Sequence, residues 1–150
     1  MNKILNCAMA FSFSTMQPLA CEAAVFYPED SVQVRIVPKQ TSVAYFVYSN
    51  FAEIRKDISF DTEKALKIEI DDYNFDGYKD IAVSHIDDGM GSFVVYRVFL
   101  YSADSKDFEE TMPSCGDQFL NLQIDKKRKV LVSTYYEENV PVLCEAYSRV

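Results

Sequence analysis

Apolar and polar residues alternate along several stretches of this chain. Residues 31–37, SVQVRIV, place apolar side chains at every second position, namely Val32, Val34 and Ile36. Successive side chains of a β-strand point to opposite faces, so this pattern is typical of a strand with one buried and one solvated face. Pro38 cannot donate a ladder hydrogen bond and is expected to end the strand.

Further strand-like stretches follow, with turn signals between them. Alternating runs or runs rich in β-branched and aromatic residues cover residues 42–50, 65–71, 80–85, 92–102, 129–136 and 140–150. Glycine-containing or charged turns are expected at residues 87–91, 102–110 and 124–129. The stretch YEEN, residues 136–139, is expected to turn a hairpin between the last two strands.

One stretch has helical spacing. Phe51, Ile54 and Ile58 recur at intervals of three and four, which predicts a short helix around residues 49–58. No internal repeat is recognisable. The sequence as a whole therefore predicts a mainly β fold, a small antiparallel β-sheet or sandwich domain of about seven strands.

The first residues have the features of an export signal. Lys3 supplies a positive charge, and the apolar run that follows is too short to span a bilayer. Small residues in LACEAA predict cleavage after Ala23, which makes residues 1–23 a signal peptide and residues 24–150 a single exported β-rich domain. Two alternatives stay open, namely lipoprotein acylation of Cys21 and a buried helix over residues 1–23.

Cysteine usage agrees with export. Cleavage after Ala23 would remove Cys7 and Cys21 and leave Cys115 and Cys144. In an oxidising compartment such an even pair is expected to form a disulfide, which would close a loop of about 28 residues. Two buried free thiols are the alternative.

The charge of the chain limits the class of partner. With 23 acidic and 15 basic residues, the formal net charge is −8. This excess argues against nucleic acid, since contacts to phosphates need a basic face. It suits a cationic partner or bound cations. The alternative is that the acidity serves solubility alone.

A metal-binding pattern occurs once, in IDDYNFDGYKDIAV, residues 70–83. Oxygen-bearing residues alternate around Gly77 in the order D-x-N-x-D-G-x-x-D. The predicted ligands follow positions 1, 3, 5, 7 and 9 of a calcium loop, the fourth of them through its backbone carbonyl: Asp72, Asn74, Asp76, Tyr78 and Asp80. Position 12, where an EF-hand has a bidentate Glu, is Val83, which indicates that a strand follows the loop.

The donors of this loop favour Ca²⁺ as the cation. Hard oxygen ligands with no nearby His or Cys suit calcium, and carboxylates packed this closely would repel one another without a cation. Waters or a further carboxylate would complete the coordination: Asp71, or Asp87 or Asp88 if the next turn folds back. The alternative is a metal-free turn whose Asn and Asp side chains cap backbone amides.

No set of residues typical of a catalytic centre is recognisable. The single histidine, His85, has no evident nucleophile as a partner, and neither Ser84 nor Ser92 has the sequence context of a nucleophile elbow. The protein is therefore expected not to be an enzyme. A metal-dependent hydrolase is the weaker alternative.

The calcium-type loop and the sequence after it resemble a known family. DDYNFDGYKDIAV is followed by a glycine-containing turn, by YRVFLYSADSKDFEE and by LNLQIDKKRKVLVSTYYEENVPVLCEAYSRV, so the resemblance covers residues 65–150. In the order of its motifs and in its residue types, this stretch is similar to periplasmic lysozyme-inhibitor-like proteins, which act as immunity proteins against secreted peptidoglycan-cleaving effectors. The loop also resembles the calcium loops of integrin-type FG-GAP repeats.

The resemblance implies a periplasmic, calcium-braced β-domain that blocks a basic, lysozyme-like peptidoglycan hydrolase. Such inhibitors commonly insert a loop with Ser and Tyr into the enzyme cleft, and the local counterpart is DDGMGSFVVY. The residues implied to contact the partner are Asp87, Asp88, Ser92 and Tyr96. Gly91 precedes Ser92 instead of following it, which departs from the family pattern, and an ordinary turn with Tyr96 in the sheet is the alternative.

Two further expectations concern this resemblance. A calcium loop beside the 87–92 turn would preorganise that turn for binding. The alternative function is an FG-GAP-like calcium-dependent adhesive or carbohydrate-binding module, although a propeller would need several copies of the loop.

Overall fold

The computed structural model of the protein describes residues 4–6, 23–50 and 52–147. Every regular element within these ranges is a β-strand, so the expected mainly β class is confirmed. A helix that could cross a membrane does not occur in the part of the chain described here.

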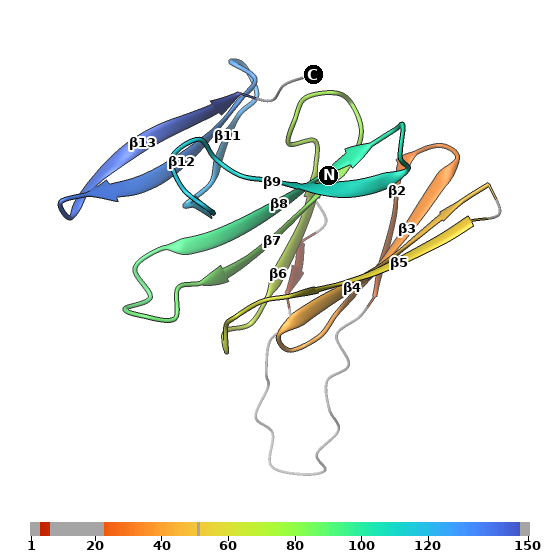
Figure 1. Ribbon diagram of the computed structural model, residues 1–150, viewed down its shortest axis with the longest axis horizontal. Coiled ribbons are helices and arrows are strands. Elements are labelled where there is room, and N and C mark those ends of the chain that lie inside the picture. The colour runs from red at the N-terminus through yellow and green to blue at the C-terminus, as the bar shows by residue number, and fades with distance from the viewer. Residues whose placement is uncertain (1–3, 7–22, 51, 148–150) are drawn as a thin grey trace, which may run out of the picture.

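The strands form three antiparallel sheets (Figure 1). The N-terminal sheet has the strand order β2-β3-β4-β5, with the bounds β2 (Ala24–Glu29), β3 (Val32–Pro38), β4 (Ser42–Ser49) and β5 (Ala52–Ser59). The central sheet has the order β1-β6-β7-β8-β10, with β9 also paired to β8: β1 (Ile4–Asn6), β6 (Lys67–Asp71), β7 (Asp80–Ile86), β8 (Val94–Ser102), β9 (Asp107–Thr111) and β10 (Phe119–Leu120). The C-terminal sheet comprises β11 (Gln123–Asp125), β12 (Val130–Glu137) and β13 (Val140–Tyr147).

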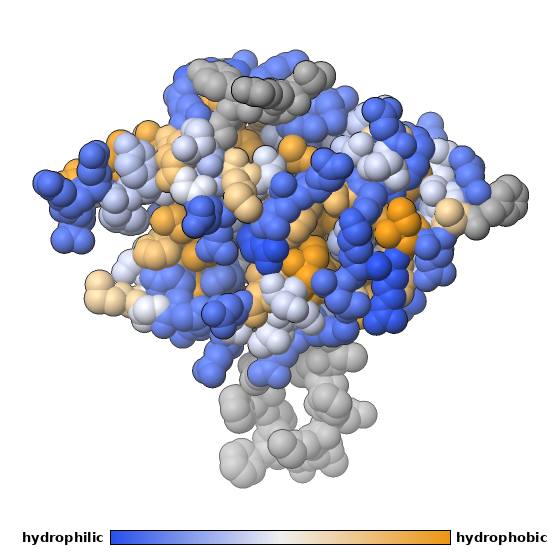
Figure 2. Space-filling view, viewed as in Figure 1, coloured by the Kyte–Doolittle hydropathy of each residue, from blue (hydrophilic) through white to orange (hydrophobic). Residues whose placement is uncertain are grey.

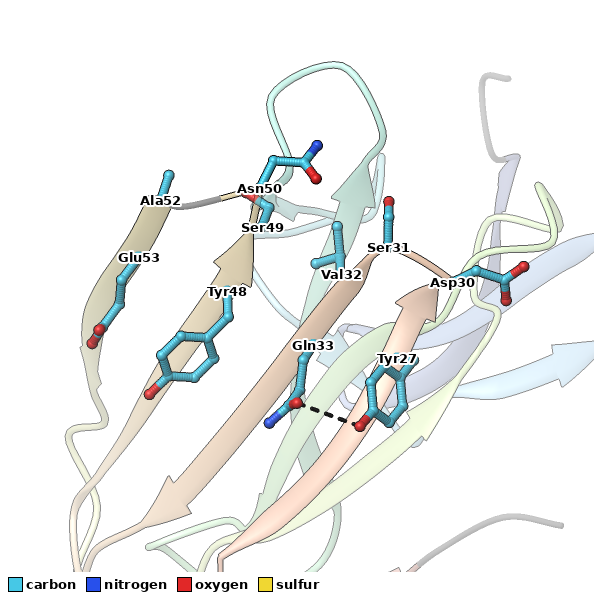
Figure 3. A pocket seen from close by; sticks show the side chains of 10 residues that line it. All are labelled: Tyr27, Asp30, Ser31, Val32, Gln33, Tyr48, Ser49, Asn50, Ala52 and Glu53. Carbon is cyan, nitrogen blue, oxygen red and sulfur yellow. Dashed lines mark hydrogen bonds between the residues drawn. The ribbon is translucent and has the colours of Figure 1, made fainter.

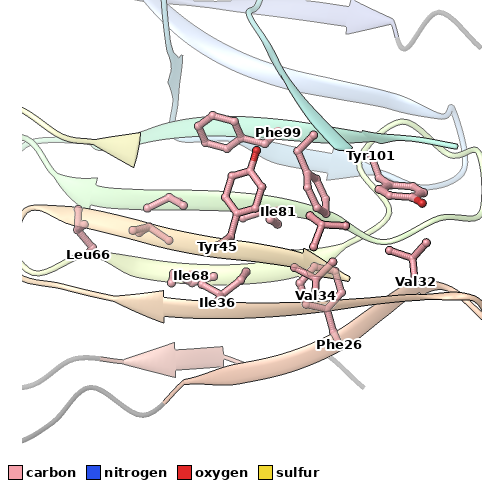
Figure 4. Close-up of a cluster of buried hydrophobic side chains, with 14 of the residues drawn as sticks. Phe26, Val32, Val34, Ile36, Tyr45, Leu66, Ile68, Ile81, Phe99 and Tyr101 are labelled. Carbon is pink, nitrogen blue, oxygen red and sulfur yellow. The ribbon is translucent and has the colours of Figure 1, made fainter. Parts of the chain in front are cut away.

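The central sheet is packed on both faces. On one face, Ile81 and Val83 of β7 join the larger core, which the N-terminal sheet supplies with residues such as Tyr45 (Figure 4). On the other face, Ala82 of β7 packs in a second core that includes Leu131 of the C-terminal sheet. A strand buried on both faces reads as a continuous apolar run, which explains IAV in the middle of β7. On the face seen in Figure 2, hydrophilic side chains predominate at the periphery, and apolar side chains are visible among them in the centre.

Most of the predicted strands are confirmed, but the predicted helix around residues 49–58 is wrong. This segment contains β5, which pairs with β4 through Val47 opposite Ile54 and Val43 opposite Ile58. Side chains four residues apart lie on one face of a helix and equally on one face of a strand, so the spacing of the two isoleucines does not separate the two structures.

The number of strands also differs from the expectation of about seven, because short or polar strands show no clear alternation of apolar and polar residues and are missed by the pattern. Residues 102–110 were expected to form a charged turn, but β9 begins at Asp107 and is held by the buried ring of Phe108. The hairpin turn expected at 136–139 is confirmed. Glu138 and Asn139 both adopt positive φ, as a two-residue primed turn requires.

The predicted signal peptide, residues 1–23, lies almost entirely outside the described residues. Only the backbone of Ile4–Asn6 is described before residue 23, and it pairs antiparallel with Lys67–Glu69 of β6. The export prediction therefore stays a prediction.

The predicted disulfide between Cys115 and Cys144 is confirmed. The bond has a Cα–Cα distance of 6.1 Å and joins residues 29 apart. Cys144 lies on β13, and Cys115 lies in the connection between β9 and β10, so the bond fastens the C-terminal sheet to the central one.

Removing this bond should lower stability without changing the fold class. Replacing both cysteines by alanine is expected to reduce the free energy of unfolding by about 3 kcal/mol, because the reduced chain regains the entropy of a 29-residue loop. Urea unfolding of the variant and of the parent protein, with and without reductant, measures this loss. A double variant as stable as the oxidised parent would contradict the fastening role.

Candidate functional site

The calcium-type loop connects β6 to β7 in the central sheet. Asp71 and Asp80 pair across its base, and the chain between them turns back on itself. Gly77 has φ of +94°, a backbone conformation that favours glycine, so the glycine of the pattern allows the loop to bend here. The predicted ligand residues Asp72, Asn74, Asp76, Tyr78 and Asp80 are thereby gathered into one short connection.

Side chains of the loop accept hydrogen bonds from its own backbone amides. Asp72 accepts hydrogen bonds from the amides of Asp76 at 3.2 Å and Gly77 at 2.9 Å. Asn74 Oδ1 accepts from the amide of Asp76 at 3.1 Å, while its Nδ2 donates to the carboxylate of Asp76 at 2.7 Å. Asp76 in turn accepts from the amide of Tyr78 at 2.8 Å. The oxygens of Asp72 and Asn74 therefore face the same amide, and the loop is closed by its own side chains.

Asp80 is the most buried member of the loop. Its side chain is 0% exposed, and its two oxygens accept from different segments. Oδ2 accepts from the amide of Tyr73 within the loop at 2.7 Å, and Oδ1 accepts from the amide of Tyr101 on β8 at 2.8 Å. β8 extends past the first residue of β7, so the carboxylate replaces the backbone acceptor that β7 does not provide to Tyr101.

The electrostatic environment of Asp80 disfavours its charged form. Burial raises the pKa of Asp80 to about 7, and the nearby charges of Asp76 and Asp72 add to the rise, while the two amide hydrogen bonds oppose it. None of the described cationic side chains forms an ion pair with this carboxylate. A buried acidic group without a counter-ion is an observation that fits a cation bound nearby.

Asp71, considered above as an additional ligand, already has cationic partners. Lys126 of the turn after β11 donates to its carboxylate at 3.0 Å, and Lys79 lies 4.0 Å away. Burial alone would raise the pKa of Asp71, but Lys126, the amide of Asp72 and Lys79 together hold that pKa below its ordinary value. Asp71 therefore serves to tie the loop to the C-terminal sheet.

Two tyrosines anchor the loop in the cores on either side of the central sheet. Tyr73 is buried in the second core beside Ala82. Tyr78 packs against the larger core, with its ring 5.7 Å from that of Tyr101 in an edge-on contact. The loop is therefore part of the framework of the molecule.

The donor chemistry of the loop fits Ca²⁺, since it offers carboxylate and amide oxygens and one backbone carbonyl. Asp72, Asn74, Asp76, Tyr78 and Asp80 are the residues that would hold the ion. As the loop stands, no three His, Cys, Asp or Glu side chains within the described ranges converge in a metal-ligating arrangement. The carboxylates of Asp72 and Asp76 would need to turn from the amides towards the ion.

The turn after β7 does not lie beside this loop, contrary to expectation. The loop precedes Asp80 and the turn follows Ile86, so they lie at opposite ends of β7, about 20 Å apart along a strand of seven residues. Neither Asp87 nor Asp88 folds back to the loop. Asp87 instead caps its own turn by accepting from the amides of Gly91 at 2.6 Å and Ser92 at 3.3 Å.

The residues implied to contact a partner are not gathered into one surface. Asp87 is buried, and Asp88 accepts a hydrogen bond from Thr62 at 2.9 Å. Ser92 is exposed in the turn, whereas Tyr96 lies within β8, opposite Ser84, and packs against the second core. The alternative of an ordinary turn with Tyr96 in the sheet describes this arrangement.

His85 also lies within this part of the sheet. Its Nδ1 is 2.9 Å from the carbonyl oxygen of Ile86 and 3.9 Å from Asp88. Sequence patterns contain no signal for Tyr101, whose amide donates to Asp80 from 21 positions away. Every residue except proline has a backbone amide, so the sequence does not single out the amide of Tyr101. The pairing of β7 with β8 identifies it as the partner of Asp80.

Comparison of the chain with protein-family models, curated proteins and solved structures finds no match. The resemblance to lysozyme-inhibitor-like proteins therefore stays a prediction.

Asp80→Ala tests the structural role of the buried carboxylate. The substitution leaves the amides of Tyr73 and Tyr101 without an acceptor, and we expect the free energy of unfolding to fall by about 2–4 kcal/mol. Asp80→Asn keeps one acceptor oxygen and should lose less. Urea unfolding measures both, with Asp104→Ala in an exposed turn as a control that should change stability by less than about 0.5 kcal/mol. Equal stability of all three variants would contradict the role.

Proposed function

We propose that the protein is an exported calcium-binding protein that binds and inhibits a lysozyme-like peptidoglycan hydrolase. One observation carries the proposal. The D-x-N-x-D-G-x-x-D loop, on which the family resemblance depends, connects two strands of a β-domain and buries Asp80 beside other carboxylates. Among the described residues, no cationic side chain is paired with Asp80. A calcium ion would supply the missing positive charge.

The overall charge supports a basic enzyme as the partner. The chain carries a formal net charge of −8, and many lysozymes are strongly basic. Opposite net charges steer two proteins together and raise the association rate, and complementary patches disfavour wrong partners. The proposed calcium ion would offset only two of these charges.

The framework of the molecule suits a binding role. Three sheets share two cores, and the loop is anchored in both by Tyr73 and Tyr78. A rigid partner loses little conformational freedom on association, which leaves more of the contact energy for affinity. Calcium would act here by holding the framework in place, at a distance from the enzyme.

The alternative function, an adhesive or carbohydrate-binding module, differs from the inhibitor in what it would bind: a glycan instead of a hydrolase. Propellers with FG-GAP-type loops are built from repeated four-stranded blades, whereas the described strands form sheets of six, three and four strands around a single such loop. Glycan binding that a chelator abolishes, together with no effect on any hydrolase, would favour the alternative.

Calcium should stabilise the folded protein. At a calcium concentration about 100 times the dissociation constant, binding to the folded state alone adds about 2.7 kcal/mol, which corresponds to a rise in Tm of about 10 °C. Thermal unfolding with calcium, with magnesium and with a chelator measures the shift.

The matched control is the double variant Asp72→Asn, Asp76→Asn, which keeps acceptors for the loop amides but removes two charges. It should fold and show no calcium-dependent shift. An unchanged Tm of the parent protein at millimolar calcium would leave the metal-free capped turn as the correct description of the loop.

Inhibition should be measurable with purified components. The protein is expected to slow cell-wall lysis by at least one type of basic lysozyme, and raising the ionic strength from about 0.05 to 0.5 M should weaken the inhibition about tenfold, because screening reduces the attraction between the two net charges. An unrelated acidic protein of similar charge is the control. A panel of lysozyme types in which none is inhibited and none forms a complex would refute the proposal.

A further inference from the structure

The outer face of the N-terminal sheet carries a row of side chains across all four strands. Glu53 of β5 is opposite Tyr48 of β4, which is opposite Gln33 of β3, and Tyr27 of β2 donates a hydrogen bond to Gln33 at 3.3 Å. Figure 3 shows the four side chains side by side on the same face of the sheet. Val47 and Tyr45 of β4 alternate with Tyr48 along the strand and point into the core, so Tyr48 and its row face solvent.

This row forms the floor of the hollow drawn in Figure 3, which has a volume of about 510 Å³. The turns at one end of the sheet complete it with Asp30 and Asn50. Tyr27 is 57% exposed, although a large aromatic side chain is more often covered. The hollow therefore combines accessible aromatic rings with a few polar groups, as binding sites commonly do.

The charges at the rim of the hollow have no counter-ions. Asp30 and Glu53 are exposed, and neither forms an ion pair or a side-chain hydrogen bond within the described part of the chain. Two cations, Arg35 of β3 and Arg55 of β5, lie one row further along the same face. Arg55 is paired with Asp57, and Arg35 forms no ion pair with a described carboxylate. The hollow thus presents net negative charge next to aromatic faces.

The adjacent row of the same sheet contains an aromatic ring and a carboxylate together with the cation that binds both. There Phe46 is opposite Arg55, and the guanidinium carbon of Arg55 lies 5.4 Å from the centroid of the Phe46 ring. Asp57 balances this cation at 3.3 Å, and Lys39 also contacts Asp57. An aromatic ring, a cation and a carboxylate therefore form one closed set.

In the row of the hollow, the corresponding positions hold Tyr48 and Glu53. The aromatic ring and the carboxylate are present, but no side chain in the described ranges supplies the cation. Guanidinium groups bind the faces of aromatic rings and pair with carboxylates at the same time.

We propose that this hollow binds an arginine side chain of a cationic protein partner, with the guanidinium over Tyr48 and paired to Glu53, while Asp30 adds negative charge at the opposite rim. The site lies on a different sheet from the calcium-type loop and does not depend on the partner being a hydrolase. Gln33, already bound to Tyr27, retains its amide for a carbonyl group of the partner.

The probe for the test is acetyl-Arg-Arg-Arg-amide, added to the ¹⁵N-labelled protein while amide chemical shifts are recorded. Shifts are expected at the backbone amides of Tyr27, Gln33, Tyr48 and Glu53, with weaker binding of the corresponding lysine peptide because an ammonium group does not stack. The double variant Asp30→Asn, Glu53→Gln should raise the Kd of the arginine peptide about fivefold. Tyr48→Thr should raise it about threefold, and Tyr48→Phe should leave it unchanged.

The matched control is Asp104→Asn, Glu109→Gln, which removes two exposed carboxylates of the same types outside the N-terminal sheet. This variant should bind the peptide as the parent protein does. Three results would overturn the proposal: shifts spread over the acidic surface, an equal loss of binding in the two double variants, or shifts in the hollow with a chitin trisaccharide but not with the peptide. Because no hydrolase is used, failure of the inhibitor assay leaves the outcome of this test unaffected.

Discussion

The buried carboxylate of Asp80 ties the calcium-type loop to the neighbouring strand β8. It begins β7, accepts the amide of Tyr73 from the loop and accepts the amide of Tyr101 from β8. The hydroxyl of Tyr101 then donates to Glu29 at the end of β2, so the connection reaches the N-terminal sheet. Burying a carboxylate is costly, and the pKa of about 7 expresses that cost. The interaction persists because both oxygens are satisfied by amides that would otherwise have no partner.

A bound calcium ion would offset the cost of burying the charged carboxylate of Asp80. Asp72 and Asp76 face the loop amides close to Asp80, and their charges make its ionisation harder. A divalent cation among them would reverse the sign of that effect. The proposed role of the ion is therefore to fix the junction of three sheets, and recognition of a partner would take place on surfaces that this junction holds in place.

How far the sequence predicts this structure depends on the range of each interaction. The alternation in residues 31–37 is local and identifies β3 correctly, and the φ of Gly77 follows from the loop pattern. The spacing of Ile54 and Ile58 is local too, but it is compatible with both a helix and a strand. Residues that become neighbours only through the register of strand pairing cannot be predicted from local sequence patterns. The hollow, for example, is formed by Tyr27, Gln33, Tyr48 and Glu53, which become neighbours only when four strands pair in one particular register.

The most direct test of the central claim is amide hydrogen exchange at Tyr73 and Tyr101, measured with and without calcium. If Asp80 holds the loop to β8, both amides should be protected far above a solvent-exposed loop amide such as that of Asp104, and calcium should slow the exchange of both further. If the two amides exchange at the rate of the Asp104 amide, or if calcium changes neither, the account of Asp80 as the calcium-braced junction of the molecule is contradicted.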